Sequence, residues 1–174
     1  MIKSDVVLLR AVEPADADIM YQWENDISLW SVSNTLTPFS YNQLKIYAND
    51  VSRDLYQSGQ LRLMIDYIAE GENEVAGMID LFDFDPFHSR AGVGIMINKK
   101  WRNRRVATEA LRLFIEYSFL YLGLHQLYCN IGADNELSVK LFEGAGFQKS
   151  GVKKEWLKRR GKYVDELFFQ LINR

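Results

Sequence analysis

The sequence predicts one α+β domain built around a mixed β-sheet, and three observations support this. The chain has 174 residues, which fits a single domain over residues 1–174. Segments with strand and helix patterns follow one another in the order β-α-α-β-β-β-α-β-α-β-β. A helix separates the strands at residues 91–97 and 126–131, so these two should be parallel, while turn-linked strands should be antiparallel. We therefore expect a largely antiparallel sheet of about seven strands, with about four helices on its two faces.

The N-terminal half is divided by helix-start signals and turns. Glu13-Pro14 precedes the first helical pattern, Ser40 is a candidate cap for the second, and Gly59 is a candidate stop. The expected elements are a strand at 6–10, a helix at 15–25, an irregular stretch at 26–38, a helix from 40 to about 57, strands at 61–68 and 75–84, a turn at 70–73, a loop at 85–89 and a strand at 91–97.

The C-terminal half has clearer signals for the starts and ends of its helices. Gly123 and Gly146 are candidate stops for two helices, and Asp134 or Asn135 is a candidate cap for the second. The expected elements are a helix at 106–122, a strand at 126–131, a helix ending near 145, and a hairpin over 148–172 that turns near Arg160-Gly161.

The composition excludes several classes of protein. With 48% hydrophobic and 25% charged residues, the chain is expected to be globular and not disordered. One cysteine, Cys129, excludes a disulfide framework and a multi-thiolate zinc site. The most apolar segment, 111–124, contains Arg112 and Glu116 and is too short to span a bilayer. We therefore expect a cytoplasmic protein without a membrane segment.

Charge is distributed unevenly along the chain. Residues 1–98 hold six basic and fifteen acidic side chains, while residues 99–174 hold fifteen basic and eight acidic ones. One interpretation is that the C-terminal half binds an anionic ligand and the N-terminal half a cationic one. The alternative is that the two halves attract each other in the fold.

The sharpest local signal is a basic turn at residues 99–105, Lys-Lys-Trp-Arg-Asn-Arg-Arg, directly before a helix. Cations there oppose the helix dipole, so they do not serve helix stability. Free N–H groups at a helix start are ready anion sites, and phosphate is a common guest. We interpret the segment as a phosphate-binding turn. A solvated loop and a nucleic-acid surface are the alternatives, and a pI near 5.7 argues against the nucleic-acid surface.

Two segments carry a resemblance to a known family. Residues 102–111, Arg-Asn-Arg-Arg-Val-Ala-Thr-Glu-Ala-Leu, resemble the acetyl-coenzyme A motif of the GNAT superfamily of N-acetyltransferases, with Arg102 and Ala107 at its first and last positions. Residues 135–147 are similar to a second motif of that family, through Asn135, Ser138, Phe142 and the closing Gly-Phe. The order of elements also agrees, so the resemblance covers nearly the whole chain.

Within the superfamily, the chain resembles the branch of polyamine (spermidine) and ribosomal-protein N-terminal acetyltransferases. The resemblance implies acetyl-CoA as co-substrate and no metal, with the cofactor arm lying between the splayed parallel strands. It implies that the pyrophosphate rests on the helix start and the arm on the end of the strand at 91–97. The implied cofactor-binding residues are Met96, Ile97, Asn98, Arg102, Asn103, Arg104, Arg105, Val106, Ala107, Thr108, Asn135, Ser138 and Phe142.

Two departures from the family pattern bear on catalysis. Arg105 stands where the motif has glycine, which costs nothing in a helical conformation and is penalised at a positive φ. Phe142 stands where many relatives have a tyrosine that protonates the thiolate. Tyr128 is a candidate replacement donor. The resemblance implies direct attack by the amine, so Cys129 is expected to be a buried core residue.

The acceptor side offers carboxylates that can accept a proton from the amine or attract its charge. The candidate bases are Glu24 and Asp83, and the candidate acceptor-binding residues are Glu24, Asp26 and Trp30. Asp80, Asp83, Asp85 and His88 form the one candidate metal cluster, and no metal is expected.

We therefore expect an enzyme that transfers an acetyl group from acetyl-CoA to a primary amine, either a polyamine or a protein N-terminus. The alternatives are a weak or inactive acyl-CoA-binding protein, suggested by Arg105 and Phe142, and a basic nucleic-acid module. Nucleic acid and membrane partners are not expected, and a homodimer is possible.

Overall fold

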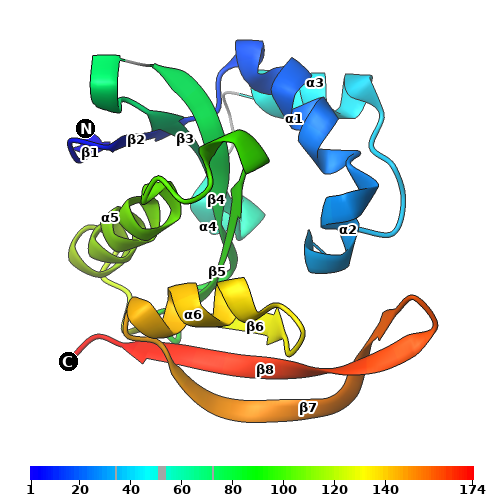
Figure 1. Ribbon diagram of the computed structural model, residues 1–174. Coiled ribbons are helices and arrows are strands. Elements are labelled where there is room, and N and C mark those ends of the chain that lie inside the picture. The colour runs from blue at the N-terminus through cyan, green and yellow to red at the C-terminus, as the bar shows by residue number, and fades with distance from the viewer. Residues whose placement is uncertain (34, 51–53, 72) are drawn as a thin grey trace.

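A computed structural model describes residues 1–33, 35–50, 54–71 and 73–174. One eight-stranded sheet runs through the molecule in the order β1-β2-β3-β4-β5-β6-β8-β7 (Figure 1). Its strands are β1 (Ile2–Lys3), β2 (Val7–Ala11), β3 (Leu61–Tyr67), β4 (Glu74–Asp85), β5 (Arg90–Ile97), β6 (Gln126–Gly132), β7 (Gln148–Arg159) and β8 (Lys162–Ile172). Every neighbouring pair is antiparallel except β5 and β6, as the helix between them predicts. The mixed α+β class is confirmed.

Helices cover both faces of the sheet. Strand residues alternate between faces, so one set packs on α5 (Val106–Leu120) and α6 (Glu136–Gly144), in a core that contains Leu111, Phe114 and Phe169. The other set packs on α1 (Ala17–Glu24) and α3 (Tyr41–Asn49), through Met64 and Met78 among others. Figure 1 shows α5 and the α1–α3 group on opposite sides of the central strands. Three layers result.

Two expectations about the N-terminal half are corrected. Residues 26–38 are not wholly irregular, because α2 (Ile27–Ser33) forms there, with Asp26 accepting a 2.9 Å hydrogen bond from the Ser28 amide. The helix expected from 40 to 57 ends at Asn49, and the short α4 (Leu55–Ser58) starts after Asp54, whose side chain caps it. The intervening residues 51–53 lie outside the described part of the chain. Ser40 caps α3 as expected, through a capping box with Gln43.

Smaller differences concern the ends of the sheet and of two helices. The short β1 pairs with β2 and makes eight strands where about seven were expected, while β7 and β8 form the expected hairpin. Helix α5 ends at Leu120, two residues earlier than expected. Asn135, and not Asp134, caps α6. No helix among the described residues is long and apolar enough to cross a membrane.

An arginine clamp ties the start of α1 to the sheet. Arg10 on β2 donates two hydrogen bonds to Asp16, at 2.7 and 2.8 Å, and a third to Asp66 on β3 at 2.7 Å. Asp16 and Asp66 are 4% and 6% exposed, so both carboxylates need this partner. Asp16 also accepts from the Glu13 amide in a capping box. The clamp fixes where α1, and therefore Glu24 at its end, stands over the sheet.

The two parallel strands are joined over a short distance and then separate. Their register consists of Arg90 with Gln126, Ala91 with Leu127, and Gly92 with Tyr128. Beyond Gly92 the two strands continue without further pairs, so an unfilled backbone edge runs along β5 toward α5. We call this opening the strand gap, and its closed end, at Gly92 and Tyr128, the apex. The splayed geometry implied by the family resemblance is present.

A glycine and a β-bulge shape the sheet beside the apex. A Cβ at Gly92 would lie 2.3 Å from the Phe82 ring, so glycine is required for that ring to lie flat over β5. At Gly94 the nearest such contact is 3.8 Å, again to Phe82. The register of β4 shifts between Phe82 and Asp85, and Asp83 within this bulge has φ +47°. Phe82 therefore divides the surface over β4 and β5 into two parts.

Candidate active site

The start of α5 is built as an anion-binding turn. Arg105 is the N-cap residue, with φ +62° and ψ +4°, and its side chain makes no capping hydrogen bond. The first amides of any helix lack intrahelical acceptors, so those of Val106, Ala107 and Thr108 are available to a ligand. Asn103 also has φ +62°. The motif position therefore does adopt the left-handed conformation, and Arg105 occupies it at a conformational cost.

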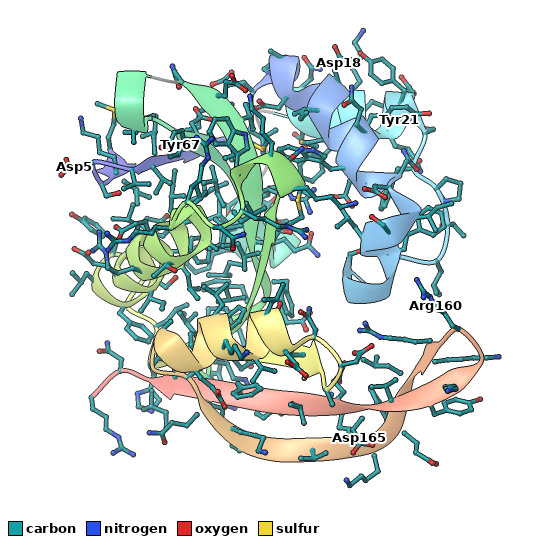
Figure 2. All side chains as sticks on the ribbon, in the orientation of Figure 1. Asp5, Asp18, Tyr21, Tyr67, Arg160 and Asp165 are labelled. Atoms are coloured by element: carbon teal, nitrogen blue, oxygen red, sulfur yellow. The ribbon has the colours of Figure 1, made fainter. Side chains whose placement is uncertain are left out.

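The cations of the basic turn do not act as one group. Arg102, Arg104 and Arg105 are exposed around the helix start, and Arg102 Nε donates to the Ile97 carbonyl at 3.3 Å. The Arg104 guanidinium lies 5.2 Å from the Trp101 ring centroid. Trp101 in turn packs against Tyr67, labelled in Figure 2, with 4.6 Å between ring centroids and 33° between the ring planes.

The two lysines face the acidic half of the chain. Lys100 pairs with Glu74 at 2.5 Å, and Lys99 Nζ lies 3.4 Å from Ser28 Oγ. The lysines therefore contact the N-terminal half, as the second interpretation of the uneven charge expects, while the arginines lie exposed around the free amides of the helix start.

The backbone of β5 offers hydrogen-bonding groups to the strand gap. The Asn98 amide donates to the Ala76 carbonyl at 2.9 Å, which turns it toward β4. Backbone groups alternate in direction along a strand, so Met96 also faces β4 while Ile95 and Ile97 face the gap. The Asn98 side chain is used as well, because it accepts from the Lys100 amide. Of the expected residues 96–98, Ile97 is therefore the one whose backbone groups face the gap, and those of Ile95 face it too.

Helix α6 borders the gap on the β6 side. Asn135 Oδ1 accepts the Ser138 amide at 3.2 Å and caps the helix, so what Asn135 offers a ligand is its amide Nδ2 donor. Ser138 is partly buried in the first turn. Phe142 is 3% exposed and meets Phe147 edge to face at 5.0 Å. Phe142 is therefore a core residue, and it carries no hydroxyl that could donate a proton.

The first cavity lies between α1, α3 and β4, and we call it the α1–β4 cavity. Its volume is about 400 Å³, and it is lined by Glu24, Phe39, Leu44, Tyr47, Gln60, Leu61, Arg62, Asp80, Leu81 and Phe82. Arg62 on β3 donates to both oxygens of Asp80, at 2.7 and 2.8 Å, and to Glu24 at 2.5 Å. One guanidinium thus shares two carboxylates, which leaves this group with a net charge of −1.

The Arg62 guanidinium is held in its charged form by its contacts. Burial works against the charge of Arg62, but the charge and hydrogen bonds of Asp80, followed by the charge of Glu24, outweigh it and raise the pKa of Arg62. Tyr47 also lies beside the guanidinium, 5.7 Å from ring centroid to Cζ. Asp80 is in register with Gly94 on β5, so the anionic wall of the cavity stands next to the strand gap.

Two of the predicted acceptor-binding residues, Asp26 and Trp30, lie outside the lining of the α1–β4 cavity. Asp26 caps α2, and the side-chain hydrogen bond of Ser28, followed by the Ser28 amide and the charge of Lys99, lowers the pKa of its carboxyl group. Trp30 Nε1 donates to the Glu24 carbonyl at 2.8 Å. Neither is among the described residues that line the α1–β4 cavity. Both instead fix the turn that carries Glu24, which itself is a lining residue as predicted.

A second cavity, which we call the β4–β6 cavity, opens on the other side of Phe82. Its volume is about 710 Å³, and it is lined by Asp83, Asp85, Arg90, Gln126, Tyr128, Asn130, Lys153, Phe168 and Gln170. Tyr128 donates its hydroxyl hydrogen to Asp83 Oδ2 at 3.1 Å. Two of the three candidate catalytic residues therefore form a pair, while the third, Glu24, lies in the α1–β4 cavity.

The remaining candidates have structural roles. Cys129 is 2% exposed on β6, and burial raises the pKa of its thiol to about 12, so it is a core residue as expected. Asp85 binds His88 and Arg90, and no group of three or more potential metal ligands occurs among the described residues.

Arg62 is a site residue that the sequence reasoning missed. It is one of six cations in residues 1–98, and it interrupts the apolar run from Leu61 to Ile65. A charged side chain within a buried strand needs partners of opposite charge, so this pattern could have indicated a charged site at Arg62.

Comparison with known proteins agrees with this geometry. The acetyltransferase (GNAT) domain family matches residues 7–148. An uncharacterized N-acetyltransferase p20 of Bacillus licheniformis is 28% identical over 166 residues, covering 95% of this chain and 92% of that protein. The spermidine N(1)-acetyltransferase of Escherichia coli K12 is 25% identical over 145 residues, covering 83% and 74%. A crystal structure of the Vibrio cholerae spermidine N-acetyltransferase with CoA and spermine has a TM-score of 0.86 at 22% identity, covering 97% and 96%.

The chain belongs to the GNAT acetyltransferase family, because the family match covers most of its length. It is an acetyl-CoA-dependent N-acetyltransferase. Its sheet, its strand gap and the anion-binding start of α5 are the parts of the structure that fit this activity.

Proposed function

We propose that the chain acetylates a primary amine of a polyamine, such as spermidine, and that the amine binds in the α1–β4 cavity. The observation that carries this is the shared guanidinium of Arg62, which leaves Glu24 and Asp80 with one uncompensated negative charge. A protonated alkylamine is complementary to that charge. Phe39, Tyr47 and Phe82 supply aromatic walls for its methylene chain and for cation–π contact.

The position of the cavity supports the same proposal. Asp80 is in register with Gly94, where β5 carries no side chain and the surface is open. An amine held by Asp80 and Glu24 therefore faces the strand gap across Gly94. The relatives named as spermidine N(1)-acetyltransferases favour a polyamine over a protein N-terminus, which remains the second candidate.

The proposed position of acetyl-CoA uses groups already described. The pyrophosphate rests on the amides of residues 103–108, with Arg102, Arg104 and Arg105 around it, and the arm pairs with Ile95 and Ile97 in the strand gap. Asn135 Nδ2 meets the arm from the β6 side. The amine attacks the thioester directly, because Cys129 is buried and its thiol stays protonated.

The test is a thiol-release assay with spermidine, spermine, N-terminal peptides and a simple monoamine. We expect the polyamines to be preferred, and Glu24→Gln and Asp80→Asn each to raise the KM for spermidine about tenfold, equivalent to about 1.4 kcal/mol. The KM for acetyl-CoA should not change. Glu116→Gln is the matched control, since Glu116 is a half-exposed carboxylate on α5, remote from the cavity. Equal activity on polyamines and peptides, or an unchanged KM in both cavity variants, contradicts the proposal.

The assay also decides the competing hypothesis of an inactive acyl-CoA-binding protein. Such a protein would gain thermal stability with acetyl-CoA and release no thiol with any amine. At a ligand concentration of about 100 times Kd, the gain is roughly 2.7 kcal/mol.

A further inference from the structure

At the Phe142 position on α6, the chain lacks a hydroxyl group that could give a proton to the leaving sulfur. When the thioester C–S bond breaks, the sulfur leaves as a thiolate that must take up a proton. Phe142 has no proton to give and is enclosed in the core with Phe147. Tyr128 stands at the apex itself, in the last residue pair between the two parallel strands.

We propose that Tyr128 donates this proton to the coenzyme A thiolate, and that Asp83 positions the Tyr128 hydroxyl and returns its proton. The proposal rests on the acetyl transfer described above and adds a residue to it. Tyr128 is then a catalytic residue, because its hydroxyl touches the leaving atom, and Asp83 is a positioning residue that acts through it.

The strand geometry places the reacting group beside Tyr128. From Ile97 to Gly92, β5 advances five residues, or about 17 Å at the usual strand rise. A narrow arm that enters the gap from the start of α5 can advance only to the apex, where Gly92 and Tyr128 are paired. Its thioester end therefore comes to rest next to Tyr128. Side chains of even-numbered residues on β6 line the β4–β6 cavity, so the phenol lies on the face from which the amine arrives.

The Tyr128 ring is held from three directions. Phe82 meets it edge to face at 5.9 Å, and Phe168 lies 5.5 Å away on the other side. The hydroxyl is fixed by Asp83 Oδ2 at 3.1 Å. Asp83 reaches this position only because the β4 bulge turns its backbone to φ +47°, a conformation that an aspartate adopts at some cost. Strained residues of this kind gather at functional sites, where the surrounding structure maintains them.

Every proton of the proposed acetyl transfer has a donor and an acceptor. The substrate ammonium first gives one proton to water, and the neutral nitrogen forms the N–C bond to the thioester carbon. The C–S bond breaks, and the Tyr128 hydroxyl turns from Asp83 toward the sulfur and gives it the O–H proton. The attacking nitrogen gives its second proton to water, and the phenolate is reprotonated from water through the exposed carboxylate of Asp83.

The surroundings keep Tyr128 protonated where the amine is reactive. Burial, followed by the hydrogen bond and charge of Asp83, raises the pKa of Tyr128 to about 12, against a smaller lowering by Arg90. Asp85 and Lys153 are the other charged residues that line the cavity. An alkylamine loses its proton near pH 10.4, so its reactive form increases over a range in which the phenol is still an acid.

The experiment compares Tyr128→Phe, Asp83→Asn and the control Tyr163→Phe, whose ring is 62% exposed on β8. We expect Tyr128→Phe to lower kcat about 100-fold with an unchanged KM for acetyl-CoA. In Asp83→Asn, the loss of kcat at high pH should begin at a lower pH than in the native chain, because the pKa of Tyr128 falls toward 10. Tyr163→Phe should match the native chain. A kcat for Tyr128→Phe within about threefold of native at every pH overturns the proposal.

Two further readouts keep the outcome interpretable. Thermal melting checks that each variant folds, and the pH profile of Asp83→Asn carries the test if Tyr128→Phe does not. Slow hydrolysis of acetyl-CoA, with water in place of the amine, also needs a proton on sulfur. A native chain that hydrolyses acetyl-CoA but acetylates no polyamine therefore refutes the substrate proposal alone, and the effect of Tyr128→Phe on hydrolysis still decides the role of Tyr128. A native chain that releases no thiol in either assay overturns both.

Discussion

Substitution of Arg105 separates a conformational cost from a contribution to binding. The residue has φ +62°, a conformation that costs a residue with a Cβ about 1–2 kcal/mol. Glycine avoids that cost but adds about 0.5–1 kcal/mol of chain entropy lost on folding. Arg105→Gly should therefore be more stable than Arg105→Ala by about 1 kcal/mol, or about 2–4 °C in Tm for a chain of this size. Both variants lack the guanidinium equally.

Urea unfolding and calorimetric titration with coenzyme A measure the two effects. Since Arg105 is exposed, its charge should contribute at most about 1 kcal/mol, so both variants should bind coenzyme A up to roughly fivefold more weakly than the native chain. Arg105→Ala as stable as Arg105→Gly, at equal m-values, would refute the left-handed assignment. Native affinity in both variants would show that the backbone amides alone hold the phosphates.

Two further predictions concern the framework of the site. Gly92→Ala should destabilise the fold by about 1–3 kcal/mol, because the new Cβ falls 2.3 Å from the Phe82 ring, while Gly94→Ala, with 3.8 Å to the same ring, should be nearly neutral; urea midpoints that rank them the other way would contradict the packing. Burial raises the pKa of Asp16, but the hydrogen bonds from Arg10 and the Glu13 amide outweigh it and lower the pKa overall. Asp16→Asn should therefore cost about 2–3 kcal/mol at neutral pH. The difference from the native chain should begin to shrink below about pH 4, where the unfolded carboxyl takes up a proton, and should be lost as pH falls through the lower pKa of the folded carboxyl; a pH-independent difference would rule out this linkage.

The parts of the fold that the sequence predicted are those set by local signals. Gly59, Gly123 and Gly146 all have positive φ near element ends, where glycine is favoured, and the period-two strands lie where expected. Helix α2 escaped prediction because the apolar and hydroxyl residues after Asp26 have no clear helical period, and Trp30 holds the segment through a tertiary hydrogen bond to Glu24. Asp50 ends α3 although the helical pattern continues beyond it.

The candidate site was predictable where one segment carries it and unpredictable where several strands meet. The basic turn before α5 and Asn135 before α6 stand in their expected places. The contacts of Arg62 join α1, β3 and β4 through residues up to 56 positions apart, and no local sequence pattern predicts these contacts. The pair of Asp83 and Tyr128 depends on a bulge that sequence alternation hides.

The short pairing of β5 with β6 divides the sheet into two parts. One part holds the five strands β1 to β5, the other holds β6, β8 and β7, and three residue pairs between β5 and β6 join them. In the complex proposed above, a cofactor arm in the gap would supply to β5 the backbone hydrogen bonds that β6 does not make beyond Gly92, and would take the place of a strand. Binding acetyl-CoA thus completes the sheet, and the exchange of the Ile95 and Ile97 amides should slow most.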